Sequence, residues 1–200
     1  MAVSLAFHTD SALTVPVSSQ SINHLVDGST DPQDFLFYLG STESANKFEN
    51  NNDPGVDQLT VSISNATALW QASTAYIVAD TARTTAKNGY RYKVQAISGG
   101  GSSGASEPSW PTTVGNTVVD NEVTWVNDGP IHEATEIKLA ASSAGLDSAT
   151  AGASLDVGTE IDGGSANAVQ IYMRIDDATA IIGQVSELGL LVADVLESPI

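Results

Sequence analysis

The sequence has no cysteine and few basic residues, and each shortage excludes a class of protein. Without cysteine, the 200-residue chain forms no disulfides and uses no thiolate chemistry, so burial and backbone pairing must supply its stability. Seven Lys and Arg stand against 24 Asp and Glu, the net charge is −17, and no basic stripe is available for a nucleic-acid partner. A run of about eighteen apolar residues is also absent, so we expect no membrane span. Residues 1–5 lack the pattern of a secretory signal.

The composition changes abruptly inside the chain. Residues 68–128 contain all three tryptophans and four of the seven basic residues, and their net charge is 4 − 5 = −1. The remainder has three basic and 19 acidic residues, and its net charge is −16. Such asymmetry indicates two modules under different surface constraints. We predict a discontinuous host domain, residues 1–67 plus 129–200, with an aromatic β-module, residues 68–128, inserted in one of its loops.

Alternating apolar and polar residues predict strands in both parts. In the clearest case, residues 168–176, Val169, Ile171, Met173 and Ile175 share one face. The other host candidates are 3–7, 20–26, 34–39, 58–63, 135–140, 153–157 and 187–193, and the Ala- and Ser-rich stretch 140–151 allows a helical turn. This spacing predicts an all-β fold, an Ig-like or jelly-roll-type β-sandwich. Residues 186–200 are apolar enough for a terminal strand or an arm that reaches a neighbour.

The module has a β pattern of its own. Residues 90–97 follow the turn signal Asn88-Gly89, and residues 118–126 predict a tight hairpin around Asp120-Asn121. Between them lies a Gly/Ser loop, residues 98–106, which we expect to have no means of packing.

Four motifs in the module carry a family resemblance. They are Trp70-Gln71-Ala72-Ser73-Thr74-Ala75-Tyr76, Asn88-Gly89-Tyr90-Arg91-Tyr92, Glu107-Pro108-Ser109-Trp110-Pro111-Thr112-Thr113-Val114-Gly115 and Asp120-Asn121-Glu122-Val123-Thr124-Trp125. Together they resemble a small aromatic β-module of tailed-phage structural and tail-fibre proteins. Ala79 and Asn121 depart from it, because glycine is usual at both positions.

The host part resembles Ig-like phage structural proteins. The stretches that carry this resemblance are Asp27-Gly28-Ser29, Tyr38-Leu39-Gly40-Ser41, Asp53-Pro54-Gly55-Val56-Asp57 and Ala166-Asn167-Ala168-Val169. Both resemblances imply a component of a tailed-bacteriophage virion that is built from repeated copies, on the capsid, neck or tail. Neither brings catalytic residues with it.

No residue pattern predicts a catalytic, metal or cofactor site. His132-Glu133-Ala134-Thr135-Glu136 has Glu136 where a zinc-protease helix needs its second histidine, so we interpret it as a loop that enters a strand. Asp53 and Asp57 supply two carboxylates where calcium needs about six to eight oxygens, which favours a turn. There is no Gly-x-Ser-x-Gly elbow and no Gly-rich phosphate loop with lysine. We therefore expect no enzyme and no cofactor.

The aromatic side chains of the module are the candidate ligand- or partner-binding residues. They are Trp70, Tyr76, Tyr90, Tyr92, Trp110 and Trp125. A small module needs large aromatic residues to fill its core, which favours a structural role. The alternative is a stacking platform for sugar rings or for a partner surface.

These observations leave two hypotheses for the function. The first is a virion structural protein, a homo-oligomer made in the host cytoplasm, which contacts other virion proteins and assembles in symmetric copies to stabilise or decorate the particle. The second is a carbohydrate-binding adhesion module that recognises host glycans. Neither hypothesis involves a nucleic acid or a membrane as a partner.

Overall fold

The computed structural model describes residues 3–20, 32–176 and 186–200, and the chain divides into two compact units. The first unit is Met1–Ser64, Ala134–Ala178 and Gly189–Ile200, and the second is Asn65–Glu133 and Thr179–Leu188. The unit boundaries lie three to five residues outside the predicted module, 68–128, and a later segment also joins the second unit. The insertion of one folded domain in a loop of the other stays a prediction.

The predicted all-β class is confirmed. The helices among the described residues are short 3₁₀ turns: η1 (Ala134–Glu136), η2 (Ser143–Asp147) and η3 (Ser165–Asn167). The second of these lies in the stretch where a helical turn was expected. Among the described residues, no helix has both the length and the apolar character needed to span a membrane.

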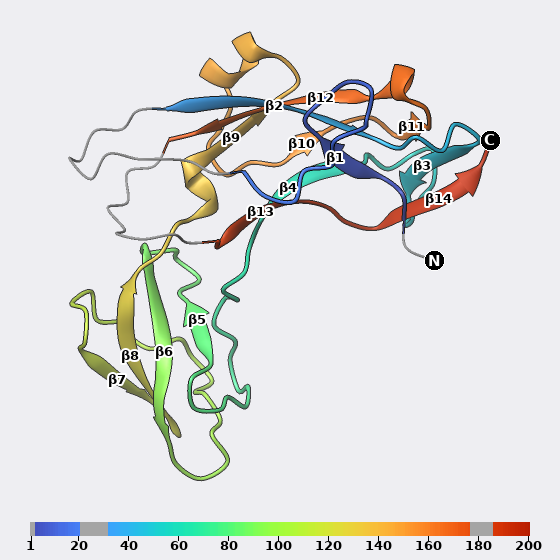
Figure 1. The fold of residues 1–200 in the computed structure, drawn as a ribbon. Coiled ribbons are helices and arrows are strands. Elements are labelled where there is room, and N and C mark those ends of the chain that lie inside the picture. The colour runs from blue at the N-terminus through green and yellow to red at the C-terminus, as the bar shows by residue number, and fades with distance from the viewer. Residues whose placement is uncertain (1–2, 21–31, 177–185) are drawn as a thin grey trace. The chain divides into compact units, whose positions relative to one another are not determined.

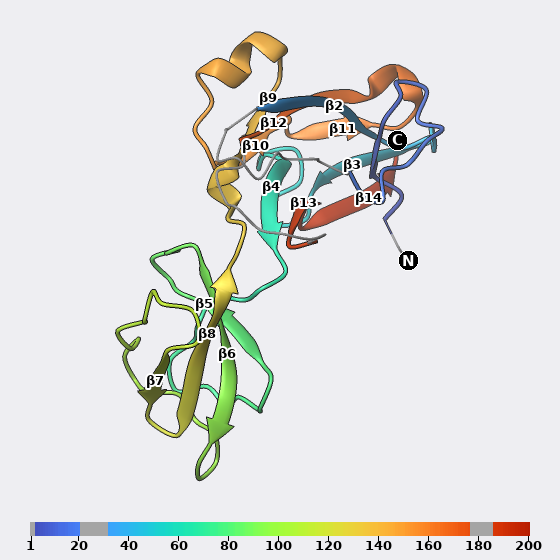
Figure 2. The ribbon, with the colours of Figure 1, turned by 60° about the vertical axis from the view of Figure 1, so that its left-hand side comes forward.

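The described part of the first unit contains ten strands in three sheets. They are β1 (Ala6–His8), β2 (Gln33–Gly40), β3 (Asn46–Asn50), β4 (Thr60–Asn65), β9 (Ile137–Ala140), β10 (Leu155–Asp156), β11 (Glu160–Asp162), β12 (Val169–Ile175), β13 (Leu188–Val192) and β14 (Val195–Pro199). The sheet orders are β1-β2-β12-β9, β10-β4-β13 and β11-β3-β14. In Figures 1 and 2, β2, β12 and β9 form one layer of the first unit, and β3, β4 and β14 form a second layer across from it.

Strand β12 shows why the sequence forms this sandwich. It pairs antiparallel with β2, with Ile171 opposite Phe37 and Met173 opposite Phe35. Ile171, Met173 and Ile175 are buried while Gln170 is exposed, as the alternation predicts. Burial of one face fixes the register, because a slip by one residue would turn these apolar side chains to solvent.

Most of the predicted host strands are present with shifted ends. Those at 34–39, 58–63, 135–140, 153–157, 168–176 and 187–193 correspond to β2, β4, β9, β10, β12 and β13, and the one at 3–7 is shifted to β1. Residues 21–26 of the predicted strand 20–26 lie outside the described residues, as do Asp27, Gly28 and Ser29. Residues 195–199 form the terminal strand β14, which pairs with β3.

The second unit contains one four-stranded antiparallel sheet. Its strands are β5 (Thr81–Arg83), β6 (Tyr90–Ile97), β7 (Thr117–Asp120) and β8 (Val123–Pro130), in the order β5-β6-β8-β7 (Figure 1). The predicted hairpin around Asp120-Asn121 is present as β7 and β8, and Asn121 has a φ of 55° in its turn. Asparagine tolerates this left-handed conformation better than most residues, which suits the departure from glycine.

Candidate functional site

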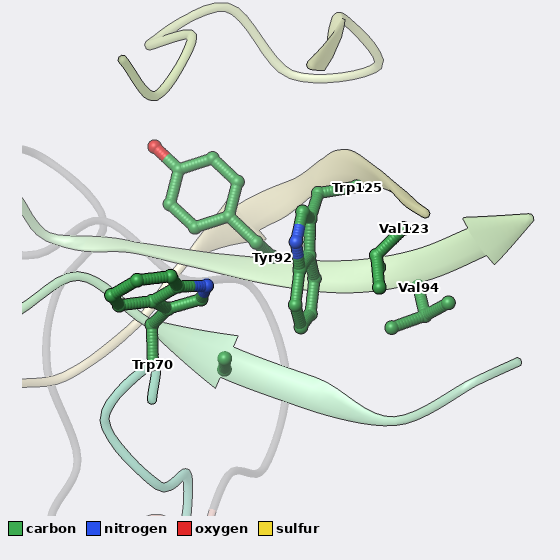
Figure 3. Packing of buried hydrophobic residues seen from close by; sticks show 6 residues of the cluster. Trp70, Tyr92, Val94, Val123 and Trp125 are labelled. Atoms are coloured by element: carbon green, nitrogen blue, oxygen red, sulfur yellow. The ribbon is translucent and has the colours of Figure 1, made fainter. Parts of the chain in front are cut away.

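The six candidate aromatic residues gather on one face of the second unit's sheet. Trp70, Tyr92 and Trp125 are buried, with 6%, 0% and 0% of their surface exposed, together with Ala82, Val94 and Val123 (Figure 3). Tyr76, Tyr90 and Trp110 are half-buried and pack against this cluster. All six are therefore brought together, and the buried three fill the core that a small sheet needs.

The rings that contact Trp125 are arranged edge to face, and a third pair is tilted. The ring of Trp125 contacts Tyr76 at a centroid distance of 4.8 Å and Trp110 at 5.6 Å, with interplanar angles of 76° and 68°. Tyr92 lies 4.2 Å from Trp110 with a tilt of 37°. Such pairs contribute about 0.5–1.5 kcal/mol each beyond the area they bury. The cluster is thus a fixed network of contacts centred on Trp125.

A buried carboxylate holds two of the indoles. Asp120 is 4% exposed, and its Oδ2 accepts hydrogen bonds from Nε1 of Trp70 at 2.9 Å and Nε1 of Trp125 at 3.2 Å. Its Oδ1 accepts from the backbone N–H of Gly104 at 2.8 Å. Buried charges are tolerated where hydrogen bonds satisfy them, and here one side chain connects three separate segments. The sequence indicated Asp120 only as a hairpin residue.

The hydroxyl of Tyr92 anchors the segment that carries Trp110. It donates to the carbonyl oxygen of Pro111 at 3.0 Å and accepts from Nδ2 of Asn88 at 2.9 Å. The same carbonyl accepts from Nδ2 of Asn127 at 2.8 Å. Burial is the largest influence on the Tyr92 hydroxyl and raises its pKa. A neutral hydroxyl suits this role, because it must keep its proton to donate to Pro111.

Glu107 fixes Trp110 from the other side. Its Oε1 accepts from Nε1 of Trp110 at 2.8 Å and from the backbone N–H of Thr85 at 2.9 Å, and its Oε2 accepts from the Thr85 hydroxyl. Burial disfavours the charged form, but the hydrogen bonds from Thr85 and Trp110 outweigh it and lower the pKa of Glu107. The carboxylate form therefore stabilises the position of the Trp110 ring.

The expectation for the Gly/Ser loop, residues 98–106, was wrong. Gly101 and Ser103 are buried, and Gly100 and Ser102 donate backbone hydrogen bonds to Glu122 Oε2, each at 3.0 Å. Ser103 Oγ donates to the carbonyl oxygen of Gln71 at 2.8 Å. The loop packs through its backbone, and a Cβ at Gly101 would lie 2.6 Å from the Tyr76 carbonyl oxygen. Here glycine permits close approach and not flexibility.

The motifs considered for metals have structural roles where the structure describes them. Glu133 pairs with Arg83 at 3.0 Å, and η1 and β9 follow it, as the loop-and-strand interpretation predicted. Asp53 accepts backbone hydrogen bonds from Val56 and Asp57 through its own carbonyl oxygen, at 3.1 and 2.9 Å, as in a turn. In residues 3–20, 32–176 and 186–200, no three His, Asp or Glu side chains lie close enough together to hold a metal ion.

A second feature is an open depression of about 390 Å³ in the first unit, which we call the apolar depression after its lining side chains, although polar and apolar atoms share its exposed surface almost equally. Eight apolar side chains and Asp194 line it, and they come from the N-terminal segment, β1, β2, β13 and the start of β14. Leu191 and Val3 in its lining are 46% and 42% exposed. The one signal in the sequence was the run Leu190-Leu191-Val192, which is apolar without alternation.

The comparisons with known proteins add no identification. No protein-family model, curated protein or solved structure matches this chain. Two structural features bear on the function: the aromatic cluster of the second unit and the apolar depression of the first.

Proposed function

We propose that the chain is a structural protein of a tailed-virus particle, in which symmetric copies stabilise or decorate the surface of the capsid, neck or tail. The observation that carries the proposal is the apolar depression, in which Leu191 and Val3 are nearly half-exposed within a strongly acidic chain. A concave surface lined by apolar side chains that reach solvent is a candidate site of protein–protein contact. The resemblance of both parts of the sequence to phage structural proteins supports a tailed-virus particle as the assembly in which this contact is made.

The aromatic cluster supports a mechanical role for the second unit. Trp70, Tyr92 and Trp125 are buried in the core, and Asp120 bridges two of them. Rigid units with satisfied polar groups suit a particle component, because they hold their contact surfaces in place without a bound ligand.

Quantitative mass spectrometry of purified particles tests the proposal. We expect the chain to be present in a fixed, symmetric number of copies relative to the major capsid protein. Removal of its gene should leave particles that release their contents at lower temperature or lower denaturant concentration. Absence of the chain from purified, infectious particles would contradict the proposal.

Glycan binding is the second candidate, and the half-buried rings favour it. Trp110 packs on Tyr92 on one side, and Tyr76 and Tyr90 are also only half-buried. Partly exposed aromatic rings are suitable surfaces for stacking sugars. A fluorescence titration with host polysaccharide would favour this function if quenching were saturable and were lost in Tyr90→Ala while the fold was retained.

A further inference from the structure

A tight turn of the second unit presents two neighbouring apolar side chains to solvent. Ile77 and Val78 are 68% and 54% exposed, and they are consecutive in the chain. Single exposed aliphatic residues are ordinary on protein surfaces, but adjacent ones on one turn form a small protruding apolar surface. We call residues 77–80 the apolar turn.

Hydrogen bonds hold the apolar turn in one conformation. Asp80 N donates to the Ile77 carbonyl oxygen at 3.1 Å, and Asp80 Oδ2 accepts from Ile77 N at 2.8 Å. The turn is joined to strand β6, because Ala79 N donates to the Val94 carbonyl oxygen at 3.0 Å and Val94 N to that of Asp80 at 2.8 Å. Ile77 and Val78 are therefore displayed on a fixed support, which reduces the entropy lost when they are buried against a partner.

The third residue of the apolar turn is strained. Ala79 has a φ of +79°, the conformation that glycine prefers at this position of a type II turn. For a residue with a Cβ it costs about 1–2 kcal/mol. Backbone strain of this kind persists where surrounding contacts impose it, and it is concentrated at functional surfaces.

A lysine lies beside the apolar turn. Lys93 directly precedes Val94, the residue that binds the turn, and it pairs with Thr81 of β5. Its side chain is exposed, and it has no ion pair within the described part of the chain. Lys93 is one of only seven basic residues in a chain with a net charge of −17, and within the described residues Lys87 and Lys138 also have no ion pair.

The depression of the first unit complements the apolar turn, because one is hollow and the other projects, and because each has a charge of opposite sign beside it. It is concave and is lined by eight apolar side chains and Asp194, whereas the turn exposes the apolar side chains of Ile77 and Val78. Asp194, the acidic residue in its lining, is exposed, has a φ of 53°, and forms no ion pair with a described residue. One chain thus carries an apolar projection beside a cation and an apolar hollow beside an anion.

We propose that the apolar turn of one copy inserts into the depression of a second copy, with Lys93 opposite the neighbour's Asp194. The inference rests on the proposed function, since it names the contact through which copies assemble. The contact joins two different surfaces, so it is head-to-tail, and such contacts build closed rings or open filaments. A second copy is favoured over an unrelated partner because both complementary surfaces are on one chain.

A mixing experiment with two variants tests this contact. Val78→Asp disables the turn but keeps the depression, and Leu191→Asp disables the depression but keeps the turn. We expect native mass spectrometry to show oligomers for the unmodified chain, monomers for each variant alone, and a one-to-one dimer for their mixture. The dimer is the diagnostic species, since a head-to-tail contact between these variants can form once and cannot extend.

Two controls separate loss of the contact from loss of folding. Val119→Asp changes another exposed valine of the second unit, 68% exposed, and should leave the oligomers unchanged. Lys93→Glu should weaken assembly on the order of tenfold, and adding Asp194→Lys should restore it, because the pair is only reversed. Restoration by a second charge change cannot arise from misfolding.

Three results would overturn the inference: a monomeric unmodified chain at every concentration, variants that assemble like the unmodified chain, or a mixture that stays monomeric. The last two leave the proposed function standing if the chain is found in purified particles. Absence from those particles is a separate measurement and is the one that counts against the proposed function itself.

Discussion

Removal of the Asp120 carboxylate should lower the free energy of unfolding of the second unit more than a surface substitution of similar size does. In Asp120→Ala, the indole N–H groups of Trp70 and Trp125 and the backbone N–H of Gly104 lose their acceptor. Both indoles are buried, so water does not replace the carboxylate without opening the core. The variant also leaves a void where the carboxylate was.

The structure sets the size of the effect. A buried donor left without a partner costs about 1–3 kcal/mol, so the two buried indole donors predict a loss of about 2–6 kcal/mol in the free energy of unfolding. A domain of this size typically has about 5–10 kcal/mol in total. Asp120→Asn keeps the shape and an acceptor oxygen but places an amide N–H against a donor, so we expect a loss of about 1–3 kcal/mol.

Urea unfolding followed by tryptophan fluorescence measures this effect, because all three tryptophans lie in the second unit. Asp128→Ala is the matched control, since Asp128 forms a partly exposed ion pair with Arg91 at 2.8 Å. Its loss should cost less than about 1 kcal/mol. If Asp120→Ala and Asp128→Ala shifted the urea midpoint equally, the argument that Asp120 organises the aromatic core would be refuted.

Three further changes test other parts of the second unit. Ala79→Gly should raise its free energy of unfolding by about 0.5–1 kcal/mol in urea, since relief of the positive φ outweighs the added entropy of glycine; a loss would show that Ala79 is not strained. Gly101→Ala should destabilise by about 2 kcal/mol or more in the same assay, because its Cβ meets a carbonyl oxygen at 2.6 Å and its φ is +72°, and a neutral effect would contradict the packing of the Gly/Ser loop. The pKa of Glu107 is lowered in the folded state, so its contribution to stability is present above about pH 4.5 and is lost as the pH falls through the folded pKa. Urea midpoints measured between pH 7 and pH 3 should therefore decline towards low pH, and Glu107→Gln should make this decline smaller. An unchanged decline in the variant would contradict the role of Glu107.

The sequence predicted those elements whose pattern is local. Strand β12 alternates over seven residues, and the β7–β8 hairpin has a turn residue, Asn121, at its centre. Strand β3 was missed because Asn46–Asn50 is polar apart from Phe48. It forms because β11 and β14, distant in sequence, pair with its two edges and bury Phe48 completely. Tertiary pairing of this kind overrides local propensity.

The candidate site shows the same division. Large aromatic residues in a small module predict a core, and the structure buries Trp70, Tyr92 and Trp125. The packed Gly/Ser loop could not be foreseen, because its N–H groups bind acceptors of the β7–β8 hairpin, Asp120 and Glu122. A Gly/Ser composition says only that side chains do not pack; whether the backbone does depends on partners elsewhere in the chain.

Reconstruction of the particle that we propose to contain the chain, at a resolution that traces it, tests the central claim most directly. The account predicts density for both units in symmetry-related copies, with the turn around Val78 of each copy seated against Leu191 of the next. Density that placed the copies apart, each held only by other proteins, would contradict the head-to-tail contact. A particle in which no copy could be placed would contradict the structural role as a whole.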